Sequence, residues 1–90
     1  MEIRNTVEGF VMENLMTVLD QYPEACRCEK CCRDIAILAL NNLPAKYAAT
    51  EKGDTYTRLS LYTQENNLAI IREIAKAIEI VIKNPHHENM

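Results

Sequence analysis

Glycine is scarce in this chain of 90 residues, which contains only two glycines and three prolines. The glycine-rich loops that cradle phosphate groups in P-loop and dinucleotide-binding proteins need several glycines at fixed spacing, so both kinds of site are excluded. The low glycine and proline content, with 26% charged and 48% hydrophobic residues, also argues against a disordered chain. We therefore expect one compact domain spanning residues 1–90.

Excess positive charge and long apolar runs are lacking too. The formal net charge is -3 and the pI is about 5.3, so the chain as a whole does not attract nucleic acids or anionic membranes. No apolar run approaches the ~18 residues that a membrane-spanning helix needs. Residues 1–5 lack the basic and apolar segments of a signal peptide. These absences predict a cytoplasmic protein that binds neither membranes nor, directly, DNA or RNA.

Recognisable catalytic residues are missing as well. No serine, histidine and aspartate stand in a context typical of nucleophilic catalysis. The two histidines, His86 and His87, lie near the C-terminus, where a general base would be poorly fixed. We predict a protein that is not an enzyme, and an open catalytic zinc site only if a fourth protein ligand is absent.

Helical periodicity dominates the rest of the chain and predicts an all-α fold without convincing strands. A first amphipathic helix is expected from about Thr6 to Gln21, before Tyr22–Pro23. A second is expected from near Glu29 to about Asn42, and its segment 35–40 is apolar on every side, which predicts burial on all faces. Residues 44–60 are the least regular part and are interpreted as a binding loop that has room for a short helical turn.

The last predicted helix is the longest and runs from Leu61 or Thr63 to Lys83. Its roughly 21 residues would be about 30 Å long, the full width of a domain of this size. One broad stripe of the helix is apolar: Leu68, Ile71, Ile74, Ala75, Ile78, Val81 and Ile82. A small domain has a marginal core that often needs a metal or a second subunit, so we predict a homodimer.

All four cysteines lie within the segment Cys26–Cys32, in the pattern CxCxxCC. Disulfides among them would close very short loops and add little stability, whereas a CxxC turn that leads into a helix is typical of a zinc site. Clustered cysteines in a cytoplasmic protein also favour metal chemistry over disulfides. We predict a structural zinc ion (Zn2+) held by Cys26, Cys28 and Cys31.

The fourth zinc ligand has three candidates. Cys32 is adjacent to Cys31, and neighbouring side chains seldom reach one ion without distortion, so a histidine beyond the last helix is preferred. His87 is the first choice, and His86 and Cys32 are the alternatives. Two other interpretations stay open: four ordinary reduced cysteines, or a redox switch based on the thiols.

Four motifs together resemble the late competence protein ComFB family. They are Cys26-x-Cys28-x-x-Cys31, Asp34-Ile35-x-x-Leu38-Ala39-Leu40-Asn41, Leu43-Pro44-x-Lys46-Tyr47 and Asn84-Pro85-x-His87. The resemblance implies a small, mainly helical, homodimeric bacterial protein with a regulatory or accessory role in natural competence, and zinc in members that have the cysteines. Cys32 is not part of the family pattern, which favours the histidine as the fourth ligand.

The resemblance also implies an alternative function, because some similar proteins are receptors for cyclic dinucleotides such as cyclic di-GMP (c-di-GMP). Such a ligand, or cyclic di-AMP (c-di-AMP), needs cationic groups for its phosphates and flat surfaces for its bases. Residues in or beside segment 44–60 that offer these groups, in a cleft between two subunits, are Lys46, Tyr47, Tyr56, Arg58, Tyr62 and Arg72.

Overall fold

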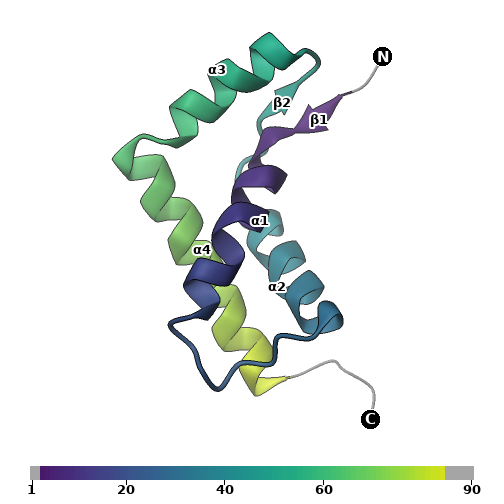
Figure 1. The fold of residues 1–90 in the computed structure, drawn as a ribbon, viewed down its shortest axis with the longest axis vertical. Helices are drawn as coiled ribbons and strands as arrows, with labels where there is room; N and C mark the ends of the chain where they lie inside the picture. Colours follow the sequence, from purple (N-terminus) through teal and green to yellow (C-terminus); the bar gives the residue numbers. More distant parts are fainter. Residues whose placement is uncertain (1–2, 85–90) are drawn as a thin grey trace.

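The computed structural model describes residues 3–84, which form a mainly helical domain with a long last helix (Figure 1). The predicted all-α fold class is confirmed. The elements along the chain are β1 (Arg4–Asn5), α1 (Thr6–Leu19), α2 (Glu29–Asn41), β2 (Tyr47–Ala48), α3 (Glu51–Leu61) and α4 (Gln64–Lys83).

The core lies between α1, α2 and α4. In Figure 1, α1 crosses in front of the two other helices, and its apolar face packs onto both of them. The largest side chains that are fully buried come from these three helices: Phe10, Leu19, Ile35, Ile74 and Ile78. Burial of such side chains contributes about 1.5–3 kcal/mol each, so these contacts hold the three helices together.

Each helix begins at a side chain that accepts a hydrogen bond from a backbone N–H group of the first turn. Asn5 caps α1, Thr50 caps α3 and Thr63 caps α4, as expected for residue types that favour this position. Helix α2 is capped by the sulfur of Cys28, which accepts from the N–H of Cys31. The start of α2 and the cysteine cluster are therefore one structural feature.

Two short strands correct the prediction that the chain has none. Strands β1 and β2 pair in antiparallel fashion, with Arg4 opposite Ala48 and Asn5 opposite Tyr47. The side chain of Asn5 also accepts from the N–H of Lys46, and the N–H of Thr6 donates to the Lys46 carbonyl. Strands of two residues are too short to produce an alternating sequence pattern, which explains why they were missed.

Helix α3 corrects the prediction that residues 44–60 form an irregular loop. It has 11 residues, and Leu61 is its only fully buried hydrophobic side chain among those described. A helix with so small a buried face lacks the apolar stripe that periodicity detects. The arm that it forms, seen in Figure 1, contributes to an elongated shape of 43 × 30 × 18 Å.

Burial of segment 35–40 is also less complete than predicted. Ile35, Ala36 and Ala39 are buried, but Ile37 is 48% exposed, and in the predicted stripe of α4 Leu68 is 49% exposed. In a single chain, only one face of α2 meets the core. The prediction of burial on all faces is therefore wrong for the isolated chain.

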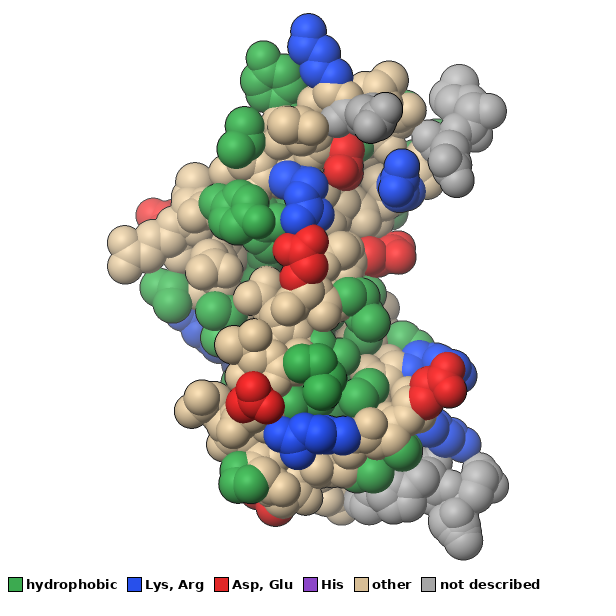
Figure 2. Space-filling model, viewed as in Figure 1, with side chains coloured by type: hydrophobic (Ala, Val, Ile, Leu, Met, Phe, Trp, Pro, Cys, Tyr) green, Lys and Arg blue, Asp and Glu red, His purple; other side chains and the backbone are tan. Residues whose placement is uncertain are grey.

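Further hydrophobic side chains are exposed over α1 and α3. Figure 2 shows hydrophobic groups gathered at the α3 arm and, separately, over the lower part of the same view. The exposed large side chains are Met12 and Met16 of α1, Tyr56 and Leu59 of α3, and Tyr62, which directly follows α3.

Candidate metal centre

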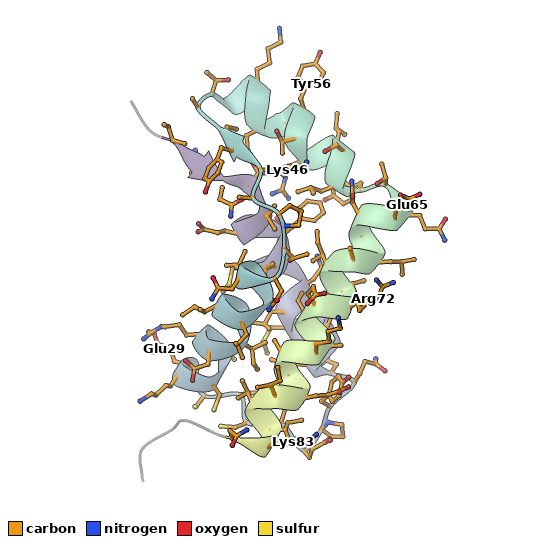
Figure 3. The ribbon with its side chains drawn as sticks, turned by 180° about the vertical axis from the view of Figure 1, so that it is seen from behind. Glu29, Lys46, Tyr56, Glu65, Arg72 and Lys83 are labelled. Carbon is orange, nitrogen blue, oxygen red and sulfur yellow. The ribbon has the colours of Figure 1, made fainter. Side chains whose placement is uncertain are left out.

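The cysteine cluster lies where three parts of the chain meet. The linker 20–28 leaves α1, passes the last turn of α4 and leads into the first turn of α2 (Figure 1). Figure 3 shows Glu29 at the start of α2 and Lys83 at the end of α4 toward the same end of the molecule. A cation bound there would join segments that are far apart in the sequence.

The sulfur atoms of Cys26, Cys28 and Cys31 all lie within 4.8 Å of one another. In a tetrahedral zinc site with Zn–S bonds of ~2.3 Å, two sulfurs are about 3.8 Å apart. Only a small inward shift would therefore bring the three sulfurs to bonding distance of one ion. The donor set fits zinc, because thiolates are among its preferred ligands. We call these three cysteines the clasp.

Backbone hydrogen bonds hold the clasp in place. The N–H of Cys28 donates to Sγ of Cys26 over 3.5 Å, and the N–H of Cys31 donates to Sγ of Cys28 over 3.4 Å. These N–H groups lie at the N-terminus of α2, where the helix dipole favours negative charge. Both features are typical of sites where cysteine sulfurs hold a metal.

Burial differs among the three sulfurs and changes their chemistry. Cys31 is fully buried, whereas Cys26 is partly exposed. Burial raises the pKa of the Cys31 thiol to about 11, and hydrogen bonds with Cys28 and Cys26 act in the same direction. Because metals bind the thiolate, a cation must displace the Cys31 proton at neutral pH.

Cys32 has different surroundings from the clasp. Its Sγ donates to the carbonyl of Arg27 over 3.6 Å, and it is not one of the three mutually close sulfurs. Burial raises the pKa of the Cys32 thiol, the nearby Cys28 and Cys26 raise it further, and Arg27 lowers it. His87 and His86, the other candidates for the fourth ligand, lie outside the described residues.

A small cavity of about 130 Å³ adjoins the clasp. Cys26 and Cys31 line it from one side, and Val81 and Ile82 of the last turn of α4 line it from the other. The described chain reaches Asn84 just beyond this turn.

The structure does not gather the predicted dinucleotide-binding residues into one site of a single chain. Tyr47 on β2 and Tyr56 on α3 are each 67% exposed. Figure 3 shows Tyr56 on the α3 arm, Lys46 just before β2 and Arg72 along α4. Lys46 contributes to a separate small cavity that is lined mostly by apolar residues.

Arg58 is already engaged by α1. Its guanidinium forms an ion pair with Glu13 and lies over the Phe10 ring, 5.0 Å from the centroid. The hydrogen bond from Arg58 to Glu13 raises the pKa of Arg58, and contact with Tyr62 acts in the same direction. Tyr62 also meets Phe10 edge to face, with ring centroids 4.8 Å apart. Arg58 therefore serves to attach α3 to α1.

Two arginines, Arg27 and Arg33, lie close to the cysteines in the sequence. In the structure Arg33 pairs with Glu29 on the surface of α2, whereas Arg27 reaches back to the end of α1. An arginine between two cysteines carries no local pattern that would predict this contact. The role of Arg27 becomes visible only in three dimensions.

Helices able to cross a membrane are not found in residues 3–84, since none is both long and apolar enough.

Comparisons with known proteins agree with one another. A family model described as "Late competence development protein ComFB" matches residues 4–85. Competence protein ComFB of Bacillus subtilis (strain 168) is 30% identical over 81 residues, which cover 90% of this chain and 83% of that protein. A solved structure of the late competence protein ComFB from Bacillus subtilis superposes with a TM-score of 0.85 at 28% identity, covering 96% of this chain and 94% of that one.

Proposed function

This chain belongs to the late competence protein ComFB family, and from that membership we propose that it is a non-enzymatic regulatory or adaptor protein linked to natural competence. We place it in the bacterial cytoplasm, with a structural zinc ion and a second copy of itself as partner. The observation that carries this proposal is the clasp, three thiols brought together between the ends of α1, α2 and α4. Their position fits a role in holding the fold together.

Zinc would be held by Cys26, Cys28 and Cys31 with His87 as the fourth ligand. Four protein ligands make a closed site, which supplies structural stability and leaves no position for a substrate. The separate surroundings of Cys32, outside the three mutually close sulfurs, support the histidine over Cys32. Cys32 and His86 are the alternatives.

Metal analysis tests the zinc site directly. Protein purified without added zinc is expected to contain about one zinc ion per chain, as a single four-ligand site requires. A zinc content near zero would refute the proposal. His87→Ala should reduce zinc retention, and His86→Ala is the matched control that removes a neighbouring imidazole. Equal zinc retention in the two variants would show that His87 is no more important for zinc binding than His86, and would refute its assignment as the fourth ligand.

A groove between α2 and α4 is the face that we assign to the second copy of the chain. It has a volume of about 420 Å³, and Ile37, Leu38 and Ile80 contribute its apolar lining. Ile37 and Ile80 are each about half exposed in the single chain. Glu73 and Lys76 lie along the adjoining surface, so the face offers both signs of charge, as a two-fold interface requires of one patch.

Sedimentation or light scattering tests this face. Ile80→Glu should convert a dimer to a monomer, because it would bury carboxylates at the interface without partners. Leu59→Glu is the control, since Leu59 is 61% exposed on the separate α3 arm. A monomeric wild-type protein, or dissociation caused only by Leu59→Glu, would refute the assignment.

The competing function is a receptor for c-di-GMP or c-di-AMP. Its support comes from the family. Figure 3 shows Lys46, Tyr56 and Arg72 on different parts of one chain, so we expect such a site to combine groups from two subunits. Calorimetric titration with both nucleotides distinguishes receptor from adaptor. Saturable binding with one nucleotide per dimer or per chain would replace the adaptor proposal with the receptor.

A further inference from the structure

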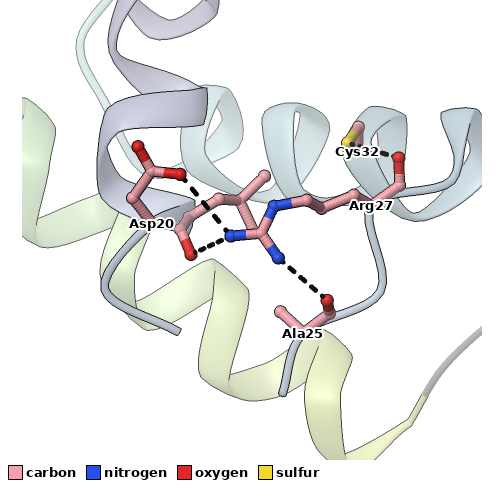
Figure 4. Close-up of polar contacts among 5 residues, drawn as sticks. Asp20, Ala25, Arg27 and Cys32 are labelled. Atoms are coloured by element: carbon pink, nitrogen blue, oxygen red, sulfur yellow. Dashed lines mark hydrogen bonds and ion pairs between the residues drawn. The ribbon is translucent and has the colours of Figure 1, made fainter. Parts of the chain in front are cut away.

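We propose that Arg27 is a positioning residue of the metal centre. Its guanidinium attaches the segment that carries Cys26 and Cys28 to the C-terminal end of α1, so that the clasp is preorganised before a cation binds (Figure 4). This inference rests on the proposed zinc site and adds a residue that does not itself touch the metal.

The contacts of Arg27 converge on the end of α1. One guanidinium nitrogen, Nη2, donates to the Leu19 carbonyl over 2.7 Å and lies 3.6 Å from Oδ1 of Asp20. The other, Nη1, donates to the Ala25 carbonyl over 3.5 Å. The Arg27 side chain is 35% exposed and that of Asp20 is 72% exposed. Exposed ion pairs are weak, so the short bond to Leu19 is the main anchor.

Helix α1 has a specific need for this cation. The last carbonyls of a helix lack intrahelical partners, and the end of the helix carries partial negative charge. The last turn of α1 contains no basic residue. Arg27 supplies positive charge from outside the helix and a second donor to the Leu19 carbonyl, which also accepts the N–H of Tyr22 over 2.8 Å. Its planar group can serve more than one acceptor at fixed geometry, which a lysine ammonium does less well.

The same residue is also held through its backbone. The Arg27 carbonyl accepts the hydrogen bond from Sγ of Cys32 in the first turns of α2. The side chain of Arg27 is thus tied to α1 and its carbonyl to α2, while Cys26 and Cys28 flank it in the sequence. The backbone between the two ligands is restricted before metal binding, which lowers the entropy lost when the ion is captured.

A simpler explanation is that Arg27 only neutralises thiolate charge. Arg33 provides a matched control, because it is another arginine close to the cysteines and its guanidinium pairs with Glu29, 3.0 Å away on the surface of α2. If charge alone mattered, loss of either arginine would weaken metal binding to a similar extent. If position matters, only loss of Arg27 will do so.

Competition with a chromophoric zinc chelator measures the affinity of the full chain and its variants. We expect Arg27→Ala to weaken zinc binding about tenfold, the lower end of the range for residues that orient metal ligands. The zinc affinity of Arg27→Lys should lie between those of Arg27→Ala and the wild type, since lysine keeps the positive charge but lacks the planar guanidinium group. Arg33→Ala should leave the affinity within about twofold, as expected for an exposed ion pair.

Thermal unfolding of the metal-free and zinc-bound forms separates positioning from general stability. A positioning role predicts a smaller zinc-induced rise in Tm for Arg27→Ala than for the wild type. General destabilisation would instead lower the Tm of the metal-free and zinc-bound forms equally and leave the zinc affinity unchanged. That second result would overturn the inference, as would equal losses in Arg27→Ala and Arg33→Ala. If Arg27→Ala does not fold, wild-type affinity in Arg27→Lys would overturn it. A wild-type chain without zinc refutes the zinc site itself, before any variant is compared.

Discussion

The clasp makes opposite predictions for two adjacent cysteines, Cys31 and Cys32. Cys31→Ala should abolish stabilisation by zinc, whereas Cys32→Ala should keep most of it, because only the hydrogen bond to the Arg27 carbonyl is lost. Cys31 is fully buried and is one of the three mutually close sulfurs, while Cys32 directs its thiol to the Arg27 carbonyl. Both substitutions remove one thiol, so the pair controls for the loss of sulfur itself.

The size of the effect follows from linkage. Zinc that is free at about 1,000 times its Kd stabilises the folded chain by about 4.1 kcal/mol. For a domain of 60–100 residues, each kcal/mol shifts Tm by about 4–8 °C, so wild-type protein should gain roughly 16–33 °C on zinc addition. Without metal, Cys31→Ala should cost about 1 kcal/mol, a typical value for a substitution. The difference between the variants therefore lies in the response to zinc.

Far-UV circular dichroism during heating, with and without zinc and a chelator, measures this response. Metal content after dialysis should agree with it, near one per chain for the wild type and for Cys32→Ala. If the gain on zinc addition survives in Cys31→Ala, the clasp is not the zinc site. If Cys32→Ala loses the gain as fully as Cys31→Ala, Cys32 is a ligand and the assignment of His87 is wrong.

Three other predictions concern contacts away from the sulfurs. Arg58→Ala should lower Tm by about 4–8 °C, because the ion pair with Glu13 and the contact with the Phe10 ring together contribute about 1 kcal/mol to stability. Amide hydrogen exchange in α3 should also become faster. An unchanged exchange rate in α3 would contradict this prediction. The hydrogen bond to Glu79 raises the pKa of Tyr22 above its usual value of 10.0. The bond therefore contributes fully to folding stability below pH 10.0, and this contribution disappears as the pH rises through the pKa of Tyr22 in the folded protein. Urea titrations should therefore show that Tyr22→Phe loses less stability than the wild type across this alkaline range, and equal losses would argue against the bond. In the same assay, Ile78→Ala should lower the free energy of unfolding by about 2–5 kcal/mol, because the Ile78 side chain is fully buried. A loss under about 1 kcal/mol would show that the core rearranges to fill the space.

The three core helices could be predicted from the sequence because their positions are set by apolar stripes. Helix α1 starts at the predicted Thr6, and α2 and α4 end within one residue of the predicted ends. The clasp could be predicted too, since the spacing of Cys28 and Cys31 determines which thiols share the first turn of a helix. Sequence patterns were sufficient for these features because residues close together in the sequence determine them.

Helix α3 and the role of Arg27 could not be predicted, for a related reason. Helix α3 is attached through the ion pair of Arg58 with Glu13 and the bond of Thr6 to Asp54, contacts between residues more than 40 positions apart. Arg27 acts on a carbonyl eight positions away, across a turn. Such contacts depend on the tertiary arrangement and leave no periodic pattern in the sequence.

The two ends of the molecule are therefore stabilised in different ways. At one end α1, α2 and α4 share the buried core and the clasp, so binding of the proposed zinc ion would be coupled to global stability there. At the other end α3 has few buried apolar contacts and is held mainly by polar ones, which is typical of segments that open at low free energy. Zinc removal should consequently weaken the core more than the attachment of α3.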